Sequence, residues 1–166
     1  MPAHRLLNQS SRPGRYFDDM ADSYDAVRMG YPPALFDDIF GYAGCSPVQQ
    51  ALEIGCGSGQ ATKSIATRGI SILCIEPGPN LAALAQHNLG EFRNVRVVCS
   101  SFEEWTLEPQ PFDLVFSANA IHWVDRRVRT RKTAKALRPR GVLAIFRSIP
   151  LRDSKVEREI DALMGR

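Results

Sequence analysis

The chain has 166 residues, of which 44% are hydrophobic and 23% charged, and its formal net charge is +3 at pH 7. These values are typical of one globular domain and argue against a disordered or fibrous protein. The charge is too small to indicate nucleic-acid binding by itself, and no apolar run is long enough to span a membrane or to form the core of a signal peptide.

The four cysteines are scattered along the chain, without a C-x-x-C pair or a cluster of histidines, at Cys45, Cys56, Cys74 and Cys99. Three of them lie in or beside apolar segments, which favours reduced thiols in the core over disulfides or a metal site. We therefore expect a cytoplasmic protein without a metal.

Residues 1–15 are polar and contain Pro and Gly, so we expect a loose arm ahead of a single domain at 16–166. Residues 16–44 are predicted to form two short entry helices. The first has apolar residues at helical spacing, namely Phe17, Met20, Tyr24 and Val27. The second runs from Pro33 to Tyr42, with an apolar stripe of Leu35, Ile39 and Phe40.

The stretch Ala51–Gly59, ALEIGCGSG, contains the clearest functional signal. A short apolar strand carries the acid Glu53 near its end and is followed by three glycines on alternate residues, Gly55, Gly57 and Gly59. Glycine has no Cβ, so a ligand can lie directly against the main chain. A helix is predicted over Gln60–Arg68, and its first turn presents unpaired N–H groups that suit an anion. Glu53 points into the crevice where open α/β sheets bind their ligands.

Two other nucleotide-binding turns were compared with this pattern. A nicotinamide or flavin site has the spacing G-x-G-x-x-G, whose third glycine falls one residue later than Gly59. A P-loop is excluded because the Gly-Lys-Ser/Thr ending is missing. The early third glycine, with an acid just before the first, resembles motif I of the class I S-adenosylmethionine-dependent methyltransferases. A dinucleotide-binding oxidoreductase stays open as a less favoured alternative.

Two more apolar segments, Ser71–Ile75 and Val95–Cys99, predict the second and third strands. Strands joined through a helical segment form βαβ units, which make the sheet parallel and the crossover right-handed. Glu76 and Pro77 then lie at the carboxyl end of the second strand. An acid about 20 residues past a glycine-rich turn binds the ribose hydroxyls in folds of this class. A helix is predicted to follow over Asn80–Leu89.

The resemblance also implies which residues contact adenine, because in this family they follow the third strand. Here they are Ser101 and Phe102. The family often has an Asp at the position of Ser101, and a hydroxyl is a weaker acceptor. Phe102 could offer an apolar surface to the base or simply pack in the core.

The segment Phe112–Ser117 predicts the fourth strand, and Asp113 at its amino end is expected to be structural. The residues that follow resemble the segment after strand four in the same family, which implies that Asn119 lies beside the methyl donor. His122 is the candidate catalytic base, because histidine serves this role most often near neutral pH. An imidazole next to Trp123 is, however, more often structural.

Residues 126–140 hold eight basic side chains and no acid. On a helix, one face carries Arg127, Arg131, Lys135 and Arg138, and the opposite face carries Thr130, Thr133, Ala134 and Leu137. We interpret this as a solvated outer face over a thin core stripe. An RNA site is less favoured, since no aromatic side chains interleave with the charges. The fifth strand is predicted over Val142–Phe146, and the family usually has Gly where Arg140 stands.

The two ends of the chain carry further resemblance to the family. The order Phe, Tyr-Asp, Arg, Tyr-Pro within residues 17–32 resembles the entry segment of small-molecule methyltransferases related to trans-aconitate methyltransferase. That resemblance implies that Tyr24 and Arg28 lie near the methionine end of the cofactor. A last helix is predicted over 154–164. The family normally continues into a sixth and seventh strand, so we expect a C-terminally short chain whose fifth strand is an edge available for a homo-oligomer.

The sequence therefore predicts an α/β fold, a Rossmann-like three-layer sandwich with a mainly parallel sheet of order 3-2-1-4-5 and a cofactor-binding core at 51–146. The resemblance implies methyl transfer from S-adenosylmethionine to a small-molecule acceptor, without a membrane or nucleic-acid partner. It implies that Glu53 holds the methionine end, that the three glycines admit the cofactor, and that Glu76 binds the ribose. The alternative is a catalytically incomplete S-adenosylmethionine-binding remnant, or half of an assembly.

Overall fold

The computed structural model of the chain describes residues 18–19, 30–43 and 48–149. The predicted arm at 1–15, most of the first entry helix with Tyr24 and Arg28, and the predicted helix at 154–164 lie outside these residues. Among the described residues, no helix is long and apolar enough to cross a membrane.

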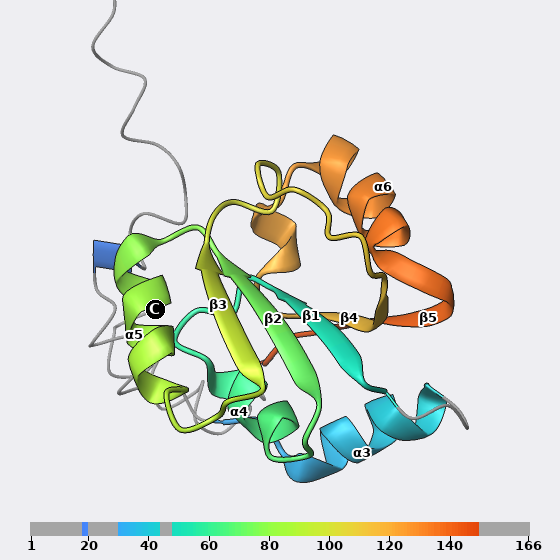
Figure 1. The fold of residues 1–166 in the computed structure, drawn as a ribbon, viewed down its shortest axis with the longest axis horizontal. Coiled ribbons are helices and arrows are strands. Elements are labelled where there is room, and N and C mark those ends of the chain that lie inside the picture. Colours follow the sequence, from blue (N-terminus) through green and yellow to red (C-terminus); the bar gives the residue numbers. More distant parts are fainter. Residues whose placement is uncertain (1–17, 20–29, 44–47, 150–166) are drawn as a thin grey trace, which may run out of the picture.

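The sheet has five parallel strands in the order β3-β2-β1-β4-β5, which confirms the predicted topology. The strands are β1 (Gln50–Ile54), β2 (Ser71–Glu76), β3 (Val95–Cys99), β4 (Phe112–Ala118) and β5 (Leu137–Phe146). The helices are α3 (Pro33–Tyr42), α4 (Gln60–Ala66), α5 (Pro79–Asn88), the 3-10 turn η1 (Ile121–Trp123) and α6 (Arg126–Ala136). Figure 1 shows helices on both faces of a twisted sheet.

Each face of the sheet carries its own apolar core, because successive strand side chains point to opposite faces. On one face, α3, α4 and α5 cover strand residues such as Ala51, Cys74 and Leu114. On the other face, α6 and the loop after β3 cover residues such as Leu52 and Val115. These two cores explain why β1, β2 and β4 are apolar at nearly every position, as strands buried on both faces are.

The bounds of α3 agree with the prediction, but its buried residue does not. Phe36 is fully buried and lies edge-on to Phe146 with ring centroids 5.9 Å apart, whereas Leu35 and Ile39 are only half-buried. The helix lies at the margin of the sheet, so one side chain rather than a whole stripe enters the core (Figure 1).

The orientation predicted for α6 is wrong by part of a turn. Thr133 and Ala136 are buried, but Thr130 and Ala134, which were expected to face inward, are exposed. The inward stripe is completed by two cations at helical spacing, Arg129 and Lys132. A sequence pattern hides such a stripe, because long cationic side chains pack their stems against apolar surface while their charged ends find polar partners.

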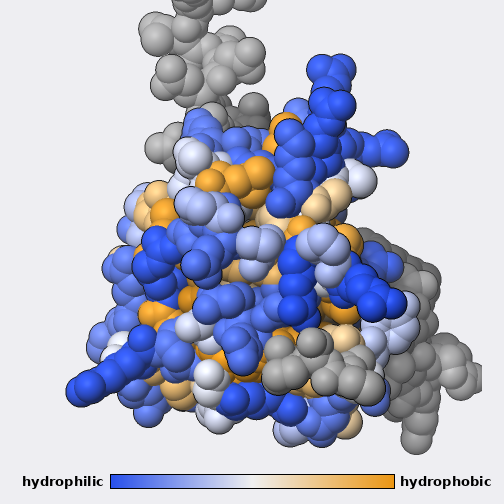
Figure 2. All heavy atoms as spheres, turned by 45° about the vertical axis from the view of Figure 1, so that its right-hand side comes forward, coloured by the Kyte–Doolittle hydropathy of each residue, from blue (hydrophilic) through white to orange (hydrophobic). Residues whose placement is uncertain are grey.

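The outer face of α6 is formed by Arg127, Arg131 and Lys135, which are exposed as predicted. Figure 2 shows long hydrophilic side chains projecting from this side of the molecule, with smaller hydrophobic patches between them. Arg138, which was expected on the same face, begins β5 instead.

The side chain of Asp113 joins the amino ends of three strands. Its Oδ2 accepts hydrogen bonds from the backbone N–H of Gln49 (2.7 Å) and Gln50 (2.8 Å), and its Oδ1 lies 2.8 Å from Nε of Arg138. The residue is 8% exposed. These contacts give Asp113 the structural role that its place at the start of β4 predicted.

β5 is the last strand of the sheet among the described residues. Leu143 and Ile145 on its α6-side face are 44% and 55% exposed. An exposed edge of this kind can pair with another chain. The self-association expected there stays a prediction.

We expect Asp113→Asn to lower the free energy of unfolding by about 2 kcal/mol, because the backbone N–H groups of Gln49 and Gln50 lose a charged acceptor. Asp37→Asn is the matched control, since Asp37 forms an exposed ion pair with Arg68 and such pairs contribute about 0–1 kcal/mol. Urea unfolding measures both. Equal effects of the two substitutions would show that Asp113 does not hold the strands together.

Arg140 has a φ of 67°, in the left-handed region that favours glycine. We expect Arg140→Gly to raise the free energy of unfolding by about 0.5–1 kcal/mol, because the strain on a Cβ is relieved and only part of that gain is lost to chain entropy. Arg147→Gly, at a position without positive φ, should give no gain. A thermal melt that shows Arg140→Gly to be destabilised would contradict the strain argument.

Candidate functional site

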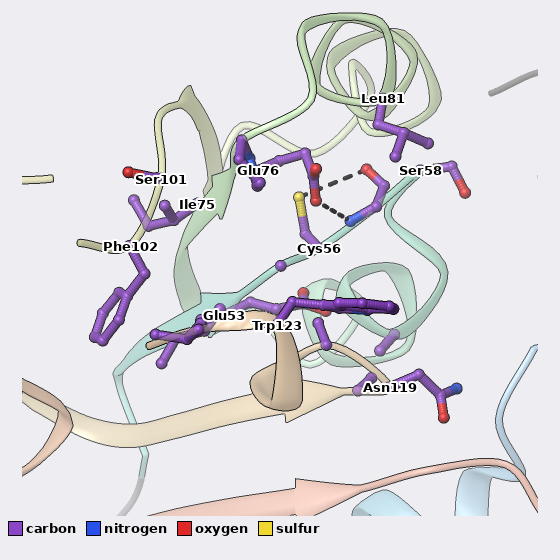
Figure 3. Close-up of a pocket in the computed structure, with 18 of the residues that line it drawn as sticks. Glu53, Cys56, Ser58, Ile75, Glu76, Leu81, Ser101, Phe102, Asn119 and Trp123 are labelled. Atoms are coloured by element: carbon purple, nitrogen blue, oxygen red, sulfur yellow. Dashed lines mark hydrogen bonds between the residues drawn. The ribbon is translucent and has the colours of Figure 1, made fainter. Parts of the chain in front are cut away.

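A cavity of about 280 Å³ opens at the carboxyl ends of β1, β2 and β4, where open parallel sheets bind their ligands. Of the predicted site residues, those that line it are Glu53, Gly55, Gly57, Glu76, Pro77, Ser101, Phe102, Asn119 and His122. Residues that were not predicted also line it, among them Tyr31, Ser58 and Trp123. Figure 3 shows side chains from all of these strand ends around one space.

The glycine turn after β1 is required by the packing of the protein itself. Gly55 and Gly59 have φ values of 72° and 93°. A Cβ on Gly55 would lie 2.4 Å from Cβ of Ala120, and one on Gly59 would lie 2.8 Å from Cδ1 of Leu89. From the sequence, this room was expected to admit a ligand, but at these two positions neighbouring side chains fill it. Gly59 therefore lies behind the cavity wall and shapes the site indirectly.

Glu76, at the end of β2, is held by backbone hydrogen bonds from two different turns. Its Oε2 accepts from N–H of Gly57 (2.9 Å), a bond drawn in Figure 3, and its Oε1 accepts from N–H of Gly78 (3.0 Å). Burial raises the pKa of the carboxyl, the two hydrogen bonds lower it, and the charge of Asp18 raises it. The carboxylate is therefore fixed in position with acceptor capacity left for a ligand on the cavity side.

Glu53 is the second carboxyl group of the cavity and is 1% exposed. The hydroxyl of Thr62 donates a hydrogen bond to its Oε2. Burial raises the pKa of Glu53 to about 8, the bond from Thr62 lowers it, and the charge of Glu76 raises it. The group is therefore largely protonated at neutral pH until a cation approaches it.

The thiol of Cys56 also lines the cavity. A hydrogen bond with Cys74 and burial raise the pKa of Cys56 well above its usual range. Since the thiolate is the nucleophilic form, Cys56 is not a candidate nucleophile. In the described ranges, no group of three or more His, Cys, Asp and Glu residues is placed to hold a metal ion.

The loop after β3 forms the wall where an adenine was expected. The hydroxyl of Ser101 accepts from N–H of Glu104 (3.2 Å) and donates to its carboxylate (2.9 Å). The hydroxyl hydrogen of Ser101 is therefore taken up by a hydrogen bond within the loop. The contact between Ser101 and adenine stays a prediction. Phe102 is 2% exposed and stacks on Trp105 with ring centroids 6.0 Å apart, so it packs in the core and also lines the cavity.

Asn119, just after β4, uses its amide to hold the surrounding chain. Its Nδ2 donates to the hydroxyl of Tyr31 (2.8 Å), and its Oδ1 accepts from N–H of Ser148 (3.0 Å). The amide therefore positions Tyr31 at the cavity. No sequence signal links these two residues, which lie 88 positions apart.

His122 and Trp123 lie in η1 beside the cavity, with ring centroids 4.7 Å apart and a 42° angle between the rings. Both side chains are exposed. The histidine is placed where a group entering from solvent would meet it. A catalytic role for it stays a prediction.

The cavity fits the cofactor that the resemblance implies. Glu76 offers an anchored acceptor for a ribose diol, and Glu53 offers a buried carboxyl that a ligand ammonium group would ionise. The hydroxyl of Ser58 is buried beside the cavity and has no hydrogen-bond partner in the described part of the chain. A buried polar atom of this kind leaves a hydrogen-bonding group that a polar ligand would satisfy.

Comparison with known proteins agrees with this geometry. A family profile described as a methyltransferase domain matches residues 52–145. The chain is 27% identical over 152 residues to an uncharacterized methyltransferase of Mycobacterium tuberculosis, an alignment that covers 90% of this chain and 59% of that protein. It is also 27% identical over 127 residues to the probable S-adenosylmethionine-dependent methyltransferase CRG1 of Saccharomyces cerevisiae, covering 74% of this chain and 43% of that protein.

Among solved structures, the fold is similar to that of phosphoethanolamine N-methyltransferase 2 of Haemonchus contortus in complex with phosphomonomethylethanolamine and S-adenosylhomocysteine. The TM-score is 0.67 at 20% identity, over 92% of this chain and 39% of that one. The chain spans 59% of the length of the mycobacterial relative. The kinship with trans-aconitate methyltransferase stays a prediction.

The raised pKa of Glu53 predicts a pH dependence of stability. A carboxyl whose pKa is higher in the folded than in the unfolded state stabilises the fold fully below the unfolded value of 4.5, and this contribution is lost as the pH rises to about 8. Glu53→Gln should remove that slope, which approaches about 1.4 kcal/mol per pH unit at most. The difference in urea unfolding free energy between wild type and Glu53→Gln should therefore change with pH. A difference that stays constant from pH 5 to 8 would contradict the assignment.

Proposed function

The chain belongs to the methyltransferase-domain family, and from that membership we propose that it transfers the methyl group of S-adenosylmethionine to a small-molecule acceptor. S-adenosylmethionine is the cofactor of this family. When bound, it supplies an electrophilic methyl group on a sulfonium. The scattered cysteines support a cytoplasmic location for the reaction.

The observation that carries the proposal is the anchored carboxylate of Glu76 beside the glycine turn. Its two backbone hydrogen bonds fix its position before any ligand arrives. A preorganised acceptor loses little entropy on binding and therefore favours a ligand that presents paired hydroxyl donors. Glu53 would hold an ammonium group at the other end of the cavity, because ionising this buried carboxyl requires a cation nearby.

Methyl transfer needs alignment of donor and acceptor more than it needs chemical groups. Correct positioning contributes about 7–11 kcal/mol to such a reaction. The residues that supply it here are Tyr31, fixed by Asn119, and the rim residue Trp123. His122 would remove a proton from an acceptor that must lose one, which contributes a typical 10²–10⁴-fold.

A small acceptor is favoured over RNA by what surrounds the cavity. The cations on the outer face of α6 line a groove together with one aromatic residue, Trp105, which is only 7% exposed. A buried ring offers no stacking platform for a base. The Haemonchus neighbour is itself in complex with a small molecule, phosphomonomethylethanolamine.

The reaction is tested with S-adenosylmethionine labelled in its methyl group. The protein is incubated with a cell extract, which is then separated into small-molecule, protein and RNA fractions. We expect label in the small-molecule fraction. Label in protein or RNA would overturn the acceptor class, and cofactor binding without any transfer would support the catalytically incomplete remnant.

We expect Glu76→Gln to weaken the affinity for S-adenosylhomocysteine by about 10- to 100-fold, because hydrogen bonds to a charged acceptor contribute about 1.5–3 kcal/mol. Glu91→Gln is the matched control, since Glu91 forms an exposed ion pair with Lys63. Titration calorimetry measures both. Unchanged affinity in Glu76→Gln would show that this carboxylate does not bind the ribose.

A further inference from the structure

Lys132 faces inward from α6 and meets the loop after β3. Its Nζ donates hydrogen bonds to the backbone carbonyls of Glu103 (3.0 Å) and Trp105. The same ammonium lies 5.3 Å from the ring centroid of Phe102 and 5.6 Å from that of Trp105. Four contacts from one side chain thus converge on three loop residues, Phe102, Glu103 and Trp105.

The carbonyls of Glu103 and Trp105 belong to a loop, outside any strand or helix. Between β3 and β4 the segment Ser101–Trp105 contains turns, held by a backbone bond from N–H of Trp105 to the carbonyl of Ser101 (2.9 Å) and by the bonds between Ser101 and Glu104. Backbone acceptors that lie away from water need partners, and their loss costs free energy. Lys132 supplies a partner for the part-buried carbonyl of Trp105, and it adds a more exposed bond to the carbonyl of Glu103.

A second connection ties the same loop to the start of α6. The carboxylate of Glu103 accepts a hydrogen bond from N–H of Asp125 (2.7 Å), and Asp125 in turn caps the helix by accepting from N–H of Arg127 (2.7 Å). The loop is therefore attached to α6 at the cap and, two turns later, at Lys132. Its position follows that of the helix.

The loop contributes one wall of the cavity through Ser101, Phe102 and Glu103, whereas Lys132 does not line the cavity. Burial lowers the pKa of Lys132, an effect that the charge of Glu103 opposes. Desolvation of an ammonium group is a cost that a merely solvated surface lysine does not have. The contacts with the loop offset that cost.

We propose that Lys132 is a positioning residue that sets the wall against which the nucleoside end of the cofactor binds. It acts through the loop Ser101–Trp105 and touches no ligand itself. This inference rests on the proposed function, because it assumes that the cavity receives S-adenosylmethionine.

The proposal predicts a loss of affinity confined to one end of the ligand. Two probes separate the ends: S-adenosylhomocysteine, which has an amino acid tail, and 5′-methylthioadenosine, which lacks it. We expect Lys132→Met to weaken both by the same factor of about ten, since lost bonds from a charged donor loosen the wall. Glu53→Gln should weaken S-adenosylhomocysteine alone.

Lys135→Met is the matched control, because Lys135 is exposed one turn further along the same helix, and it should bind both probes like wild type. Lys132→Arg should recover most of the affinity, since a guanidinium can also donate to two carbonyls. Lys132→Gln retains a donor and gives a milder variant should Lys132→Met fail to fold. We expect it to lose affinity for both probes by a smaller factor.

Calorimetry of the full chain with both probes decides between the outcomes. Equal losses in Lys132→Met or Lys132→Gln, with recovery in Lys132→Arg, support the proposal. Wild-type affinity in a folded Lys132→Gln, or a loss for S-adenosylhomocysteine alone, overturns it while the proposed function stands. A wild-type protein that binds neither probe overturns both.

Discussion

The hydrogen bond from N–H of Gly57 to the carboxylate of Glu76 connects the ends of the two central strands β1 and β2. It requires a turn after β1 that bends back over the sheet, and that turn is possible only because Gly55 and Gly59 leave room for Ala120 and Leu89. The same bond, together with the one from Gly78, keeps Glu76 from turning toward solvent. This connection therefore shapes the cavity at the ends of β1 and β2 and fixes the Glu76 carboxylate in its wall.

Two carboxyl groups buried at one end of a sheet reduce the stability of the protein without ligand. Burial raises the pKa of both Glu53 and Glu76, which means that their charged forms are disfavoured there. A cationic ligand with hydroxyl donors relieves both costs at once. The site therefore gives up stability in the free state for affinity in the bound state, as functional sites commonly do.

The sheet could be predicted from the sequence because parallel strands buried on both faces leave a strong local pattern, and the glycine turn identified the cavity. The prediction failed where distant contacts decide. Phe36 joins the core through its contact with Phe146 of β5, and Tyr31 joins the cavity through its hydrogen bond with Asn119. No local spacing in the sequence encodes either contact. The inward face of α6 was misassigned because Lys132 packs where an apolar residue was expected. Lys132 lies 27 positions from Trp105 in the sequence, so no local pattern signalled this contact.

We expect the cofactor to lie between the glycine turn and Glu76, and a titration followed by the NMR signals of the backbone amides tests this claim. With ¹⁵N-labelled protein and S-adenosylhomocysteine, we expect the glycine signals of Gly57 and Gly78 to shift to saturation. Those of Gly69 and Gly141, near the amino ends of β2 and β4, should stay in place. Unmoved signals of Gly57 and Gly78 at millimolar ligand, or shifts confined to Gly69 and Gly141, would contradict the claim.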